Sequence, residues 1–404
     1  MGGTRRFRHP IVSPAWHVYT DTLIAPLALC RGVYCLELAG DEDRFAACEA
    51  AAAATNVNVV APGVATARGV DLDRLRTLAY TRAASDLIAR TAADIDAAER
   101  ALSVATIERT GSVAVRARDV RSTTGLSTRE AEQRLGGVLV DRGFSVDLDN
   151  PDHELRALFS GETESVCLLG WLAAESRRDF GERRPTDRPF FQPGSMAPLD
   201  ARALVNIAGA APETTVVDPM CGTGGVLLEA TLVGADVVGI DAQWKMTRGS
   251  RTNLDALLSE HAGTVGRDVD ADPDTPGSVE AEVNAAVGTD TARTPTATII
   301  HGDATALPLR DGCADAVVFD APYGRQSKIA RHDLADLVGG ALAEARRIAS
   351  RAVVVADRSW DEAADAAGWT VENRFERRVH STLVRHIHVL SAADSTDDEQ
   401  TPPV

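Results

Sequence analysis

The chain of 404 residues contains only two lysines, so almost all of its positive charge is carried by arginine. Aromatic residues make up only 4% of the chain, and 59 acidic residues against 42 basic ones give a net charge of −17. An acidic excess of this kind keeps a protein dissolved at high salt and says little about its binding partners. We therefore expect a cytoplasmic protein of a halophile, and the acidic balance does not exclude RNA as a partner.

Two further absences narrow the class of protein. Six cysteines are scattered along the chain without a C-x-x-C pair, a pattern that favours reduced thiols and excludes the common zinc-binding spacings. No apolar run approaches the roughly 18 residues that a membrane-spanning helix needs. We expect a protein without a bound metal or a membrane segment, and a chain of this length predicts two or three domains.

One stretch combines a strand, a glycine-rich turn and the start of a helix. Residues 214–217 are typical of a buried strand, Asp218 ends it, and residues 226–230 begin a helix. Glycines in the turn allow a positive φ and let a ligand lie against bare backbone. This arrangement is typical of the first βα unit of a nucleotide-binding α/β fold, where the helix N-terminus offers free N–H groups. The glycines are Gly222, Gly224 and Gly225.

The glycine spacing excludes two common phosphate-binding patterns. The dinucleotide fingerprint would need a glycine at Leu227, and a P-loop would need a lysine that this stretch lacks. The sequence Asp-Pro-Met-Cys-Gly-Thr-Gly instead resembles motif I of the amino-group methyltransferases, which implies that the loop holds S-adenosylmethionine. A structural βα turn is the alternative. The residues that the resemblance assigns to the cofactor are Asp218, Met220, Gly222, Thr223 and Gly224.

Two later strand ends carry further candidate cofactor residues. Residues 236–240 predict a second strand that ends in Asp241, roughly 20 residues beyond the glycines, where a carboxylate suits the hydroxyls of a ribose. Residues 298–300 predict a third strand before Asp303 and Ala304, and in similar enzymes this stretch meets the adenine amino group. As the alternatives, Asp241 is a strand-end or capping acid, and Asp303 caps the turn before Ala304.

The fourth strand, residues 314–319, ends in Asp320-Ala321-Pro322-Tyr323-Gly324. This stretch resembles the Asp/Asn-Pro-Pro-Tyr motif of enzymes that methylate exocyclic amino groups, with Ala321 in place of the usual first proline. Such a nitrogen is a poor nucleophile because its lone pair is delocalised into the ring. The Asp320 carboxylate and the Ala321 carbonyl could draw its hydrogens and help it to rehybridise, while Tyr323 can stack on the base. An ordinary turn after a strand is the alternative.

The first part of the chain predicts a small α/β module. Ser127 followed by Glu130 forms a capping box, which marks a helix start. Alternating and helical patterns predict strands at 33–38, 112–118 and 155–159 and helices at 42–54, 81–98 and 127–140.

Part of this module resembles a THUMP domain, the RNA-binding module of several tRNA-modifying enzymes. The resemblance rests on the strand at 112–118, on residues 128–137 and on Asp-Leu-Asp-Asn-Pro at 147–151. It makes arginines near that strand candidates for phosphate contacts, with plain solvated side chains as the alternative. The candidates are Arg109, Arg116, Arg118 and Arg121.

The whole pattern resembles the archaeal tRNA (guanine(10)-N2)-dimethyltransferase family over roughly residues 33–392. In similar enzymes the Pro-Gly-Ser-Met stretch at 193–196 and the helix at 199–208 pack over the cofactor, and the alternation at 378–390 resembles the closing hairpin of the sheet. The resemblance implies a class I (Rossmann-like) α/β methyltransferase sheet with an N-terminal α+β THUMP-containing region. It also implies a monomer that transfers one or two methyl groups to N2 of guanine 10 in tRNA.

Two other functions stay open: the same chemistry on ribosomal-RNA guanine N2 or adenine N6, and tRNA binding without catalysis. The expected division of the chain follows the same resemblance. It has an extension or misplaced start (1–32), a ferredoxin-like plus THUMP RNA-binding region (33–175), a linker (176–190), a methyltransferase domain (191–392) with a disordered acidic insertion (263–295), and a disordered tail (393–404).

Overall fold

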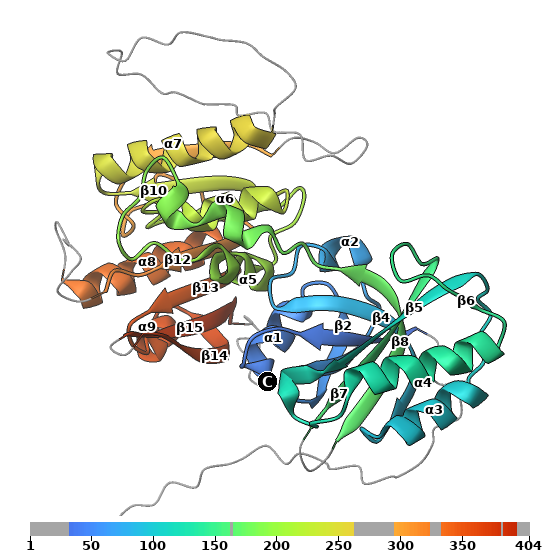
Figure 1. The fold of residues 1–404 in the computed structure, drawn as a ribbon. Coiled ribbons are helices and arrows are strands. Elements are labelled where there is room, and N and C mark those ends of the chain that lie inside the picture. Colours follow the sequence, from blue (N-terminus) through green and yellow to red (C-terminus); the bar gives the residue numbers. More distant parts are fainter. Residues whose placement is uncertain (1–31, 162–164, 262–294, 324–332, 381–382, 394–404) are drawn as a thin grey trace, which may run out of the picture.

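The computed structural model describes residues 32–161, 165–261, 295–323, 333–380 and 383–393 (Figure 1). These residues form two lobes, one up to residue 175 and one from residue 198 onward. Gly324 lies outside the described residues, as do nearly all of the predicted extension, acidic insertion and tail. No helix in the described part of the chain combines the length and the apolar character needed to span a bilayer.

The N-terminal lobe is built on one eight-stranded sheet in the order β2-β3-β1-β4-β8-β7-β5-β6. Strand β5 runs parallel to β6 and β7, and the other neighbours are antiparallel. Helices α3 and α4 bury their apolar faces against β5, β7 and β8. The bounds are β1 Val33–Leu38, α1 Asp43–Ala50, β2 Thr55–Ala61, β3 Val64–Arg68, α2 Leu72–Leu75, β4 Thr81–Thr91, α3 Ile95–Val104, β5 Ser112–Asp119, α4 Thr128–Asp141, β6 Ser145–Val146, β7 His153–Ser160 and β8 Val166–Glu175.

One predicted element of this lobe is wrong. Residues 81–98 do not form a helix: Thr81–Thr91 is strand β4, and helix α3 begins only at Ile95. The side chain of Asp94 caps that helix by accepting from the Ala97 N–H. Strand β4 lies between β1 and β8 and is buried over most of its first half, so its alanines fill a sheet interior rather than a helix face. The predicted helices around 42–54 and 127–140 are confirmed, with Ser127 accepting from the Glu130 N–H.

The C-terminal lobe is built on a seven-stranded sheet in the order β11-β10-β9-β12-β13-β15-β14. The first five strands are parallel, and β15 pairs antiparallel with both β13 and β14, with which it forms the closing hairpin. The class I α/β sheet expected from the sequence is confirmed. The bounds are α5 Pro198–Ala208, β9 Thr215–Asp218, α6 Gly225–Leu232, β10 Asp236–Asp241, α7 Trp244–His261, β11 Ala297–His301, β12 Ala316–Asp320, α8 Leu334–Ile348, β13 Arg351–Ala356, α9 Asp361–Ala366, β14 Trp369–His380 and β15 Leu383–Ala392.

Helices cover both faces of this sheet. Alternate strand residues pack into two cores, with Val216 and Val318 facing α5 and α6, and Val217 and Val317 facing α8. This alternation is the period-2 pattern expected of strands buried on both faces. The chain leaves β9 toward β10 and β11 and later returns to the other side of β9 as β12. The carboxyl ends of β9 and β12 therefore meet at the topological switch point, where open α/β sheets bind their ligands.

A buried carboxylate joins the two lobes. Glu49 at the end of α1 is fully buried and accepts hydrogen bonds from the N–H groups of Ala79 and Tyr80, each at 2.6 Å. It also accepts from Nδ2 of Asn206 in α5 at 2.7 Å. Burying a carboxylate is costly unless donors surround it, so these hydrogen bonds stabilise the contact between the two lobes.

Candidate active site

The glycine loop after β9 has the open form that a ligand needs. Asp218 is 2% exposed, and its Oδ1 accepts from the Met220 N–H at 3.0 Å. Gly222 and Gly224 have φ of 51° and 79°, values that favour glycine. A Cβ at Gly222 would meet nothing closer than the Met220 carbonyl at 4.0 Å, so this side of the loop is open.

The stretch before α5 and helix α7 hold the loop from behind. The Ser195 hydroxyl lies 3.0 Å from the Thr223 hydroxyl, which ties the Pro-Gly-Ser-Met stretch to the loop. Asn253 in α7 donates to the Thr223 carbonyl at 2.9 Å. A Cβ at Gly224 would lie 2.4 Å from the Ser250 hydroxyl, so only glycine fits there. The loop geometry is thus fixed by neighbours far along the chain.

The two acids predicted to hold the ribose and the adenine both brace backbone. Asp241 accepts from the Gly222 N–H through Oδ2 at 3.0 Å and from the Gln243 N–H through Oδ1 at 2.8 Å. Asp303 accepts from the N–H and the hydroxyl of Thr305 at 2.9 and 2.8 Å, beside the buried Ala304. Both side chains lie at carboxyl ends of the parallel strands, so the geometry agrees with the capping alternative and leaves the ligand roles as predictions.

The residues that resemble the amino-methylation motif lie at the end of β12 and directly after it. The Tyr323 hydroxyl donates a hydrogen bond to Oδ1 of Asp320. Arg385 of β15 donates from Nε to the Tyr323 oxygen at 3.1 Å, and its Nη2 lies 3.7 Å from Oδ2 of Asp320. Burial raises the pKa of Asp320 to about 6, and the Arg385 guanidinium and the Tyr323 hydroxyl oppose that rise. A carboxylate with this pKa is ionised at neutral pH and able to hold a proton transiently.

The alanine that replaces the usual proline makes a contact that proline cannot make. The Ala321 N–H donates to the Val355 carbonyl at 2.8 Å, and the residue is 2% exposed. Proline has no N–H, so this bond extends the pairing of β12 with β13 by one residue. The sheet pairing therefore gives the backbone at Ala321 some of the rigidity that a proline ring would supply. Pro322, the next residue, retains the second proline of the motif.

Three aspartates converge at the switch point from neighbouring strands. Asp218 ends β9, Asp241 ends β10 and Asp320 ends β12. Burial raises the pKa of each of these carboxyls, and repulsion from Asp241 and Asp320 raises that of Asp218 further. A cluster of acids of this kind favours a positively charged ligand, because a cation relieves their mutual repulsion.

Sequence patterns missed one group of residues at this site. Arg385 is 6% exposed, yet it follows the same inward alternation in β15 as Ile387 and Val389. An arginine at an inward position of an alternating strand is the signal that could have revealed it, because a buried guanidinium needs a partner. Its second partner, Asp200 in α5, carries no such signal.

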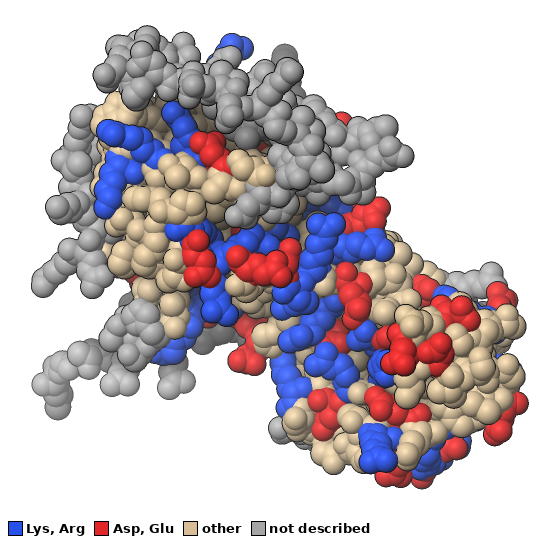
Figure 2. All heavy atoms as spheres, turned by 45° about the horizontal axis from the view of Figure 1, so that its top comes forward, with Lys and Arg blue, Asp and Glu red and all other residues tan. Residues whose placement is uncertain are grey.

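The four arginines predicted to contact phosphate each face a carboxylate. Their side chains stay 24–45% exposed. Figure 2 shows Asp and Glu atoms scattered among the Lys and Arg atoms of the N-terminal lobe on the face that it presents. The pairs are Arg109 with Asp86 at 3.3 Å, Arg116 with Glu154 at 3.9 Å, Arg118 with the buried Glu37, and Arg121 with Asp43 at 2.6 Å.

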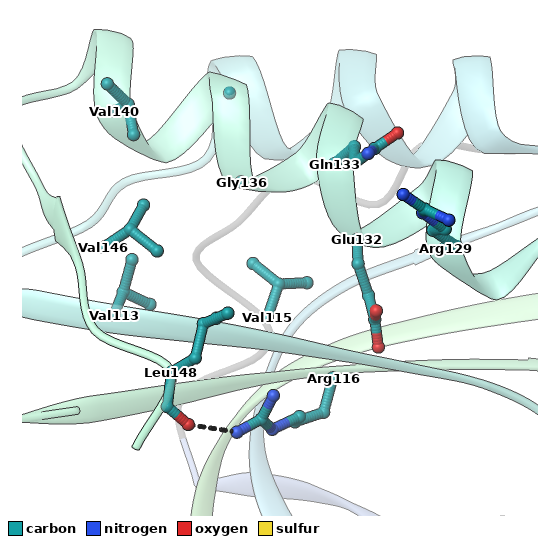
Figure 3. Close-up of a pocket in the computed structure, with 11 residues that line it drawn as sticks. Val113, Val115, Arg116, Arg129, Glu132, Gln133, Gly136, Val140, Val146 and Leu148 are labelled. Carbon is teal, nitrogen blue, oxygen red and sulfur yellow. Dashed lines mark hydrogen bonds between the residues drawn. The ribbon is translucent and has the colours of Figure 1, made fainter. Parts of the chain in front are cut away.

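A groove of about 320 Å³ lies between α4, β5 and β6 of the same lobe (Figure 3). Its apolar wall includes Val140, Val146 and Leu148, which are 47%, 57% and 58% exposed. Arg116 crosses the floor and donates to the Leu148 carbonyl at 2.6 Å. Glu132 also points into the groove, so the surface is mixed in charge rather than purely basic.

Comparisons with known proteins place the chain among methyltransferases. A family model described as "RMKL-like, methyltransferase domain" matches residues 185–387. The chain is 32% identical over 326 residues to the tRNA (guanine(10)-N2)-dimethyltransferase of Methanothermobacter thermautotrophicus, spanning 78% of this chain and 83% of that protein. The protein of the same name from Pyrococcus abyssi is 28% identical over 70% of this chain and 74% of its own. The crystal structure of TrmN from Thermus thermophilus aligns with 89% of this chain and 99% of its own at 20% identity and a TM-score of 0.44.

Proposed function

The chain belongs to the tRNA (guanine(10)-N2)-dimethyltransferase family, and we propose that it transfers one or two methyl groups to the exocyclic N2 of guanine 10 in tRNA. The family expected from the sequence is confirmed by the relative that is 32% identical over most of both chains. The observation that carries the proposed chemistry is the position of Asp320 and Asp218 at the switch point of the sheet. The acceptor carboxylate of Asp320 and the glycine loop after Asp218 thus follow the adjacent strands β12 and β9.

The residues at the switch point fit the methyl donor S-adenosylmethionine. This donor supplies a methyl group on a positive sulfonium, so that one carbon–nitrogen bond forms, one carbon–sulfur bond breaks and a neutral thioether leaves. The open side of Gly222 admits a ligand against bare backbone. The carboxylates of Asp218 and Asp241 stabilise a cation and hold a neutral product less strongly. These two acids therefore favour both binding of the donor and release of its product.

Asp320 activates the amino nitrogen. Its carboxylate accepts one amino hydrogen and the Ala321 carbonyl accepts the other, which frees the lone pair to leave the plane of the ring. The nitrogen then loses one proton, which Asp320 takes and returns to water. We assign Tyr323 the stacking of the flipped base, with its hydroxyl held by Asp320 and Arg385. The ring of Pro322 restricts the backbone between Ala321 and Tyr323.

We assign tRNA binding to residues 33–175. Arg109 and Arg116 are the better candidates for phosphate contacts, because both are more than a third exposed and neither faces a fully buried acid. Exposed ion pairs contribute about 0–1 kcal/mol, so a phosphate can replace the carboxylate. Arg118 neutralises the buried Glu37 and Arg121 grips Asp43 with two nitrogens, which favours structural roles for these two. This region resembles a THUMP domain.

A methyl-transfer assay tests the proposal. The protein is incubated at high potassium chloride with labelled S-adenosylmethionine and an unmodified tRNA transcript, and the digested nucleosides are identified. N2-methylguanosine or N2,N2-dimethylguanosine, absent when guanine 10 is replaced, is the expected result, and the ratio of the two separates single from double transfer. Methylated adenine, or label only in ribosomal RNA, would show that guanine 10 of tRNA is not the substrate, while the methyl-transfer chemistry would stand. Binding of tRNA without any transfer would overturn the assignment as an enzyme.

A further inference from the structure

One arginine contacts the catalytic carboxylate without belonging to any recognised motif. Arg385 lies in β15, on the far side of β13 from Asp320, and is 6% exposed. Its Nε donates to the Tyr323 oxygen at 3.1 Å, and its Nη2 lies 3.7 Å from Oδ2 of Asp320. Since the Tyr323 hydroxyl donates to Oδ1, each oxygen of the Asp320 carboxylate faces one of these two side chains.

The other end of the same guanidinium faces an acid from a different element. Nη1 of Arg385 lies 3.7 Å from Oδ2 of Asp200, in the first turn of α5. Oδ1 of Asp200 accepts from the Tyr80 hydroxyl at 2.6 Å, and Nη2 of Arg377 lies 3.5 Å from it. Asp200 therefore connects Arg385 to a residue of the N-terminal lobe.

An aromatic pair of the N-terminal lobe completes the contact. The rings of Phe45 and Tyr80 meet edge to face at 5.2 Å, and the Arg377 guanidinium lies 4.7 and 4.6 Å from their centroids. Arg377 belongs to β14, beside β15 in the closing hairpin. The two rings orient the Arg377 guanidinium, which also faces Asp200. The closing hairpin and the N-terminal lobe therefore both contribute to the position of Asp200.

We propose that Arg385 is a positioning residue that orients the Asp320 carboxylate toward the amino group, and that Asp200 and Tyr80 let the N-terminal lobe set its position. The inference rests on the proposed function for the role of Asp320, and its own content is the chain of contacts from Asp320 at the end of β12 to Tyr80, the residue before β4. A shift of the N-terminal lobe would thereby reach the Asp320 carboxylate through Tyr80, Asp200 and Arg385.

The charges around Asp320 explain why a cation is needed there. Arg385 faces it from β15 and Tyr323 from the loop after β12, while Asp200 in α5 and Asp218 at the end of β9 add negative charge nearby. Burial already raises the pKa of Asp320 to about 6, and Arg385 is the cation that opposes the rise. Loss of Arg385 would leave three acids to repel one another and would favour protonated Asp320, which accepts hydrogen bonds poorly.

Replacement of Arg385 by glutamine tests the positioning role. We expect Arg385→Gln to lower kcat by about 10- to 100-fold, to move the acidic limb of the kcat profile upward by about 1 pH unit, and to leave the cofactor Kd within about twofold. Arg385→Lys keeps the charge and should restore the pH limb better than kcat, because lysine lacks the planar fork. The matched control is Arg374→Gln on β14, whose side chain is 63% exposed and pairs with Asp361.

A merely structural role predicts a different result. In Arg385→Gln, kcat would then fall by the same factor at every pH, together with the fraction of protein that binds the cofactor. The pH profile of kcat would superimpose on that of the wild type after scaling. That outcome would overturn the proposal. The carbon-13 NMR titration of the Asp320 carboxyl gives a readout that needs no substrate, and an unchanged pKa in Arg385→Gln would also overturn it. Failure of the wild type to methylate tRNA would count against the proposed function alone, because this titration still decides the role of Arg385.

Removal of one hydroxyl tests the contribution of the N-terminal lobe. Tyr80→Phe keeps the ring and loses the hydroxyl contacts with Asp200 and Arg377. We expect kcat to fall about 3- to 10-fold while the tRNA Kd changes less than twofold. Tyr34→Phe on β1 is the control, since its hydroxyl lies beside Asp86 rather than Asp200. A change in tRNA Kd with kcat unaltered would show that Tyr80 serves binding, and the coupling between the lobes would be wrong.

Discussion

The two lobes hold their charged side chains in opposite ways. At the carboxyl edge of the C-terminal sheet, acids from three strands gather, and burial raises their pKa values. In the N-terminal lobe, each arginine predicted to bind phosphate faces a carboxylate. A motif at a strand end carries its own geometry, because consecutive residues must lie together. A charge inferred from composition depends on neighbours that only the fold supplies.

The sharpest break in this comparison is removal of the acceptor carboxylate. Asp320→Ala should lower kcat by about 100- to 1,000-fold, because the amino group loses the acceptor that frees its lone pair. Cofactor binding should persist, since the glycine loop and Asp241 stay in place. Calorimetric titration with S-adenosylmethionine beside the transfer assay separates the two effects. A parallel loss of cofactor affinity would count against the assigned role.

The pH profile tests the same carboxylate without any mutation. Only ionised Asp320 accepts the amino hydrogens, and its pKa is raised to about 6. kcat should therefore be level above that pH and fall about tenfold for each pH unit below it. Single-turnover rates with saturating tRNA measure the limb. A limb near pH 4 would mean that burial does not perturb Asp320, and the difference between the two lobes would shrink accordingly.

Replacement of Asp241 distinguishes a role in cofactor binding from a structural role in the loop. If it binds the ribose, Asp241→Ala should raise the cofactor Kd about tenfold or more. The mutation also removes the acceptor for the N–H groups of Gly222 and Gln243, so the melting temperature should fall as well. Asp241→Asn keeps one acceptor oxygen and serves as the milder comparison. A lower melting temperature with an unaltered Kd would return Asp241 to loop bracing.

The smallest effects should divide the arginines into two kinds. Arg116→Gln should weaken tRNA binding a few-fold and reduce the slope of log Kd against log salt by about one, as expected for a lost phosphate contact. Arg118→Gln should change tRNA affinity less and lower the free energy of unfolding more, because it leaves the buried Glu37 with fewer cations. Filter binding over a potassium chloride series and urea unfolding measure both. The reverse ranking would show that burial of the acid partner is a poor guide to phosphate contacts here.

Sequence patterns predicted the positions of the three strand-end aspartates because each of them ends a short parallel strand. Asp218, Asp241 and Asp320 all lie at the strand ends where they were expected. The same reasoning failed at residues 81–98, where an alanine-rich run fits a central strand as readily as a helix. Short apolar runs carry too little periodicity to separate the two, and the pairing of β4 with β1 and β8 settles the matter.

The sequence by itself determined the fold class, the family and the residues of the two motifs, because local spacing and strand-end chemistry are encoded within a few consecutive positions. Tertiary structure alone decided that Arg385, Asp200 and Tyr80 form a chain of contacts that leads to Asp320, since they come from β15, α5 and the N-terminal lobe. It also decided which arginines are neutralised by acids. The physical reason is the same in both cases: electrostatic contacts depend on distance in space, and residues distant in the chain approach only after the sheets have paired.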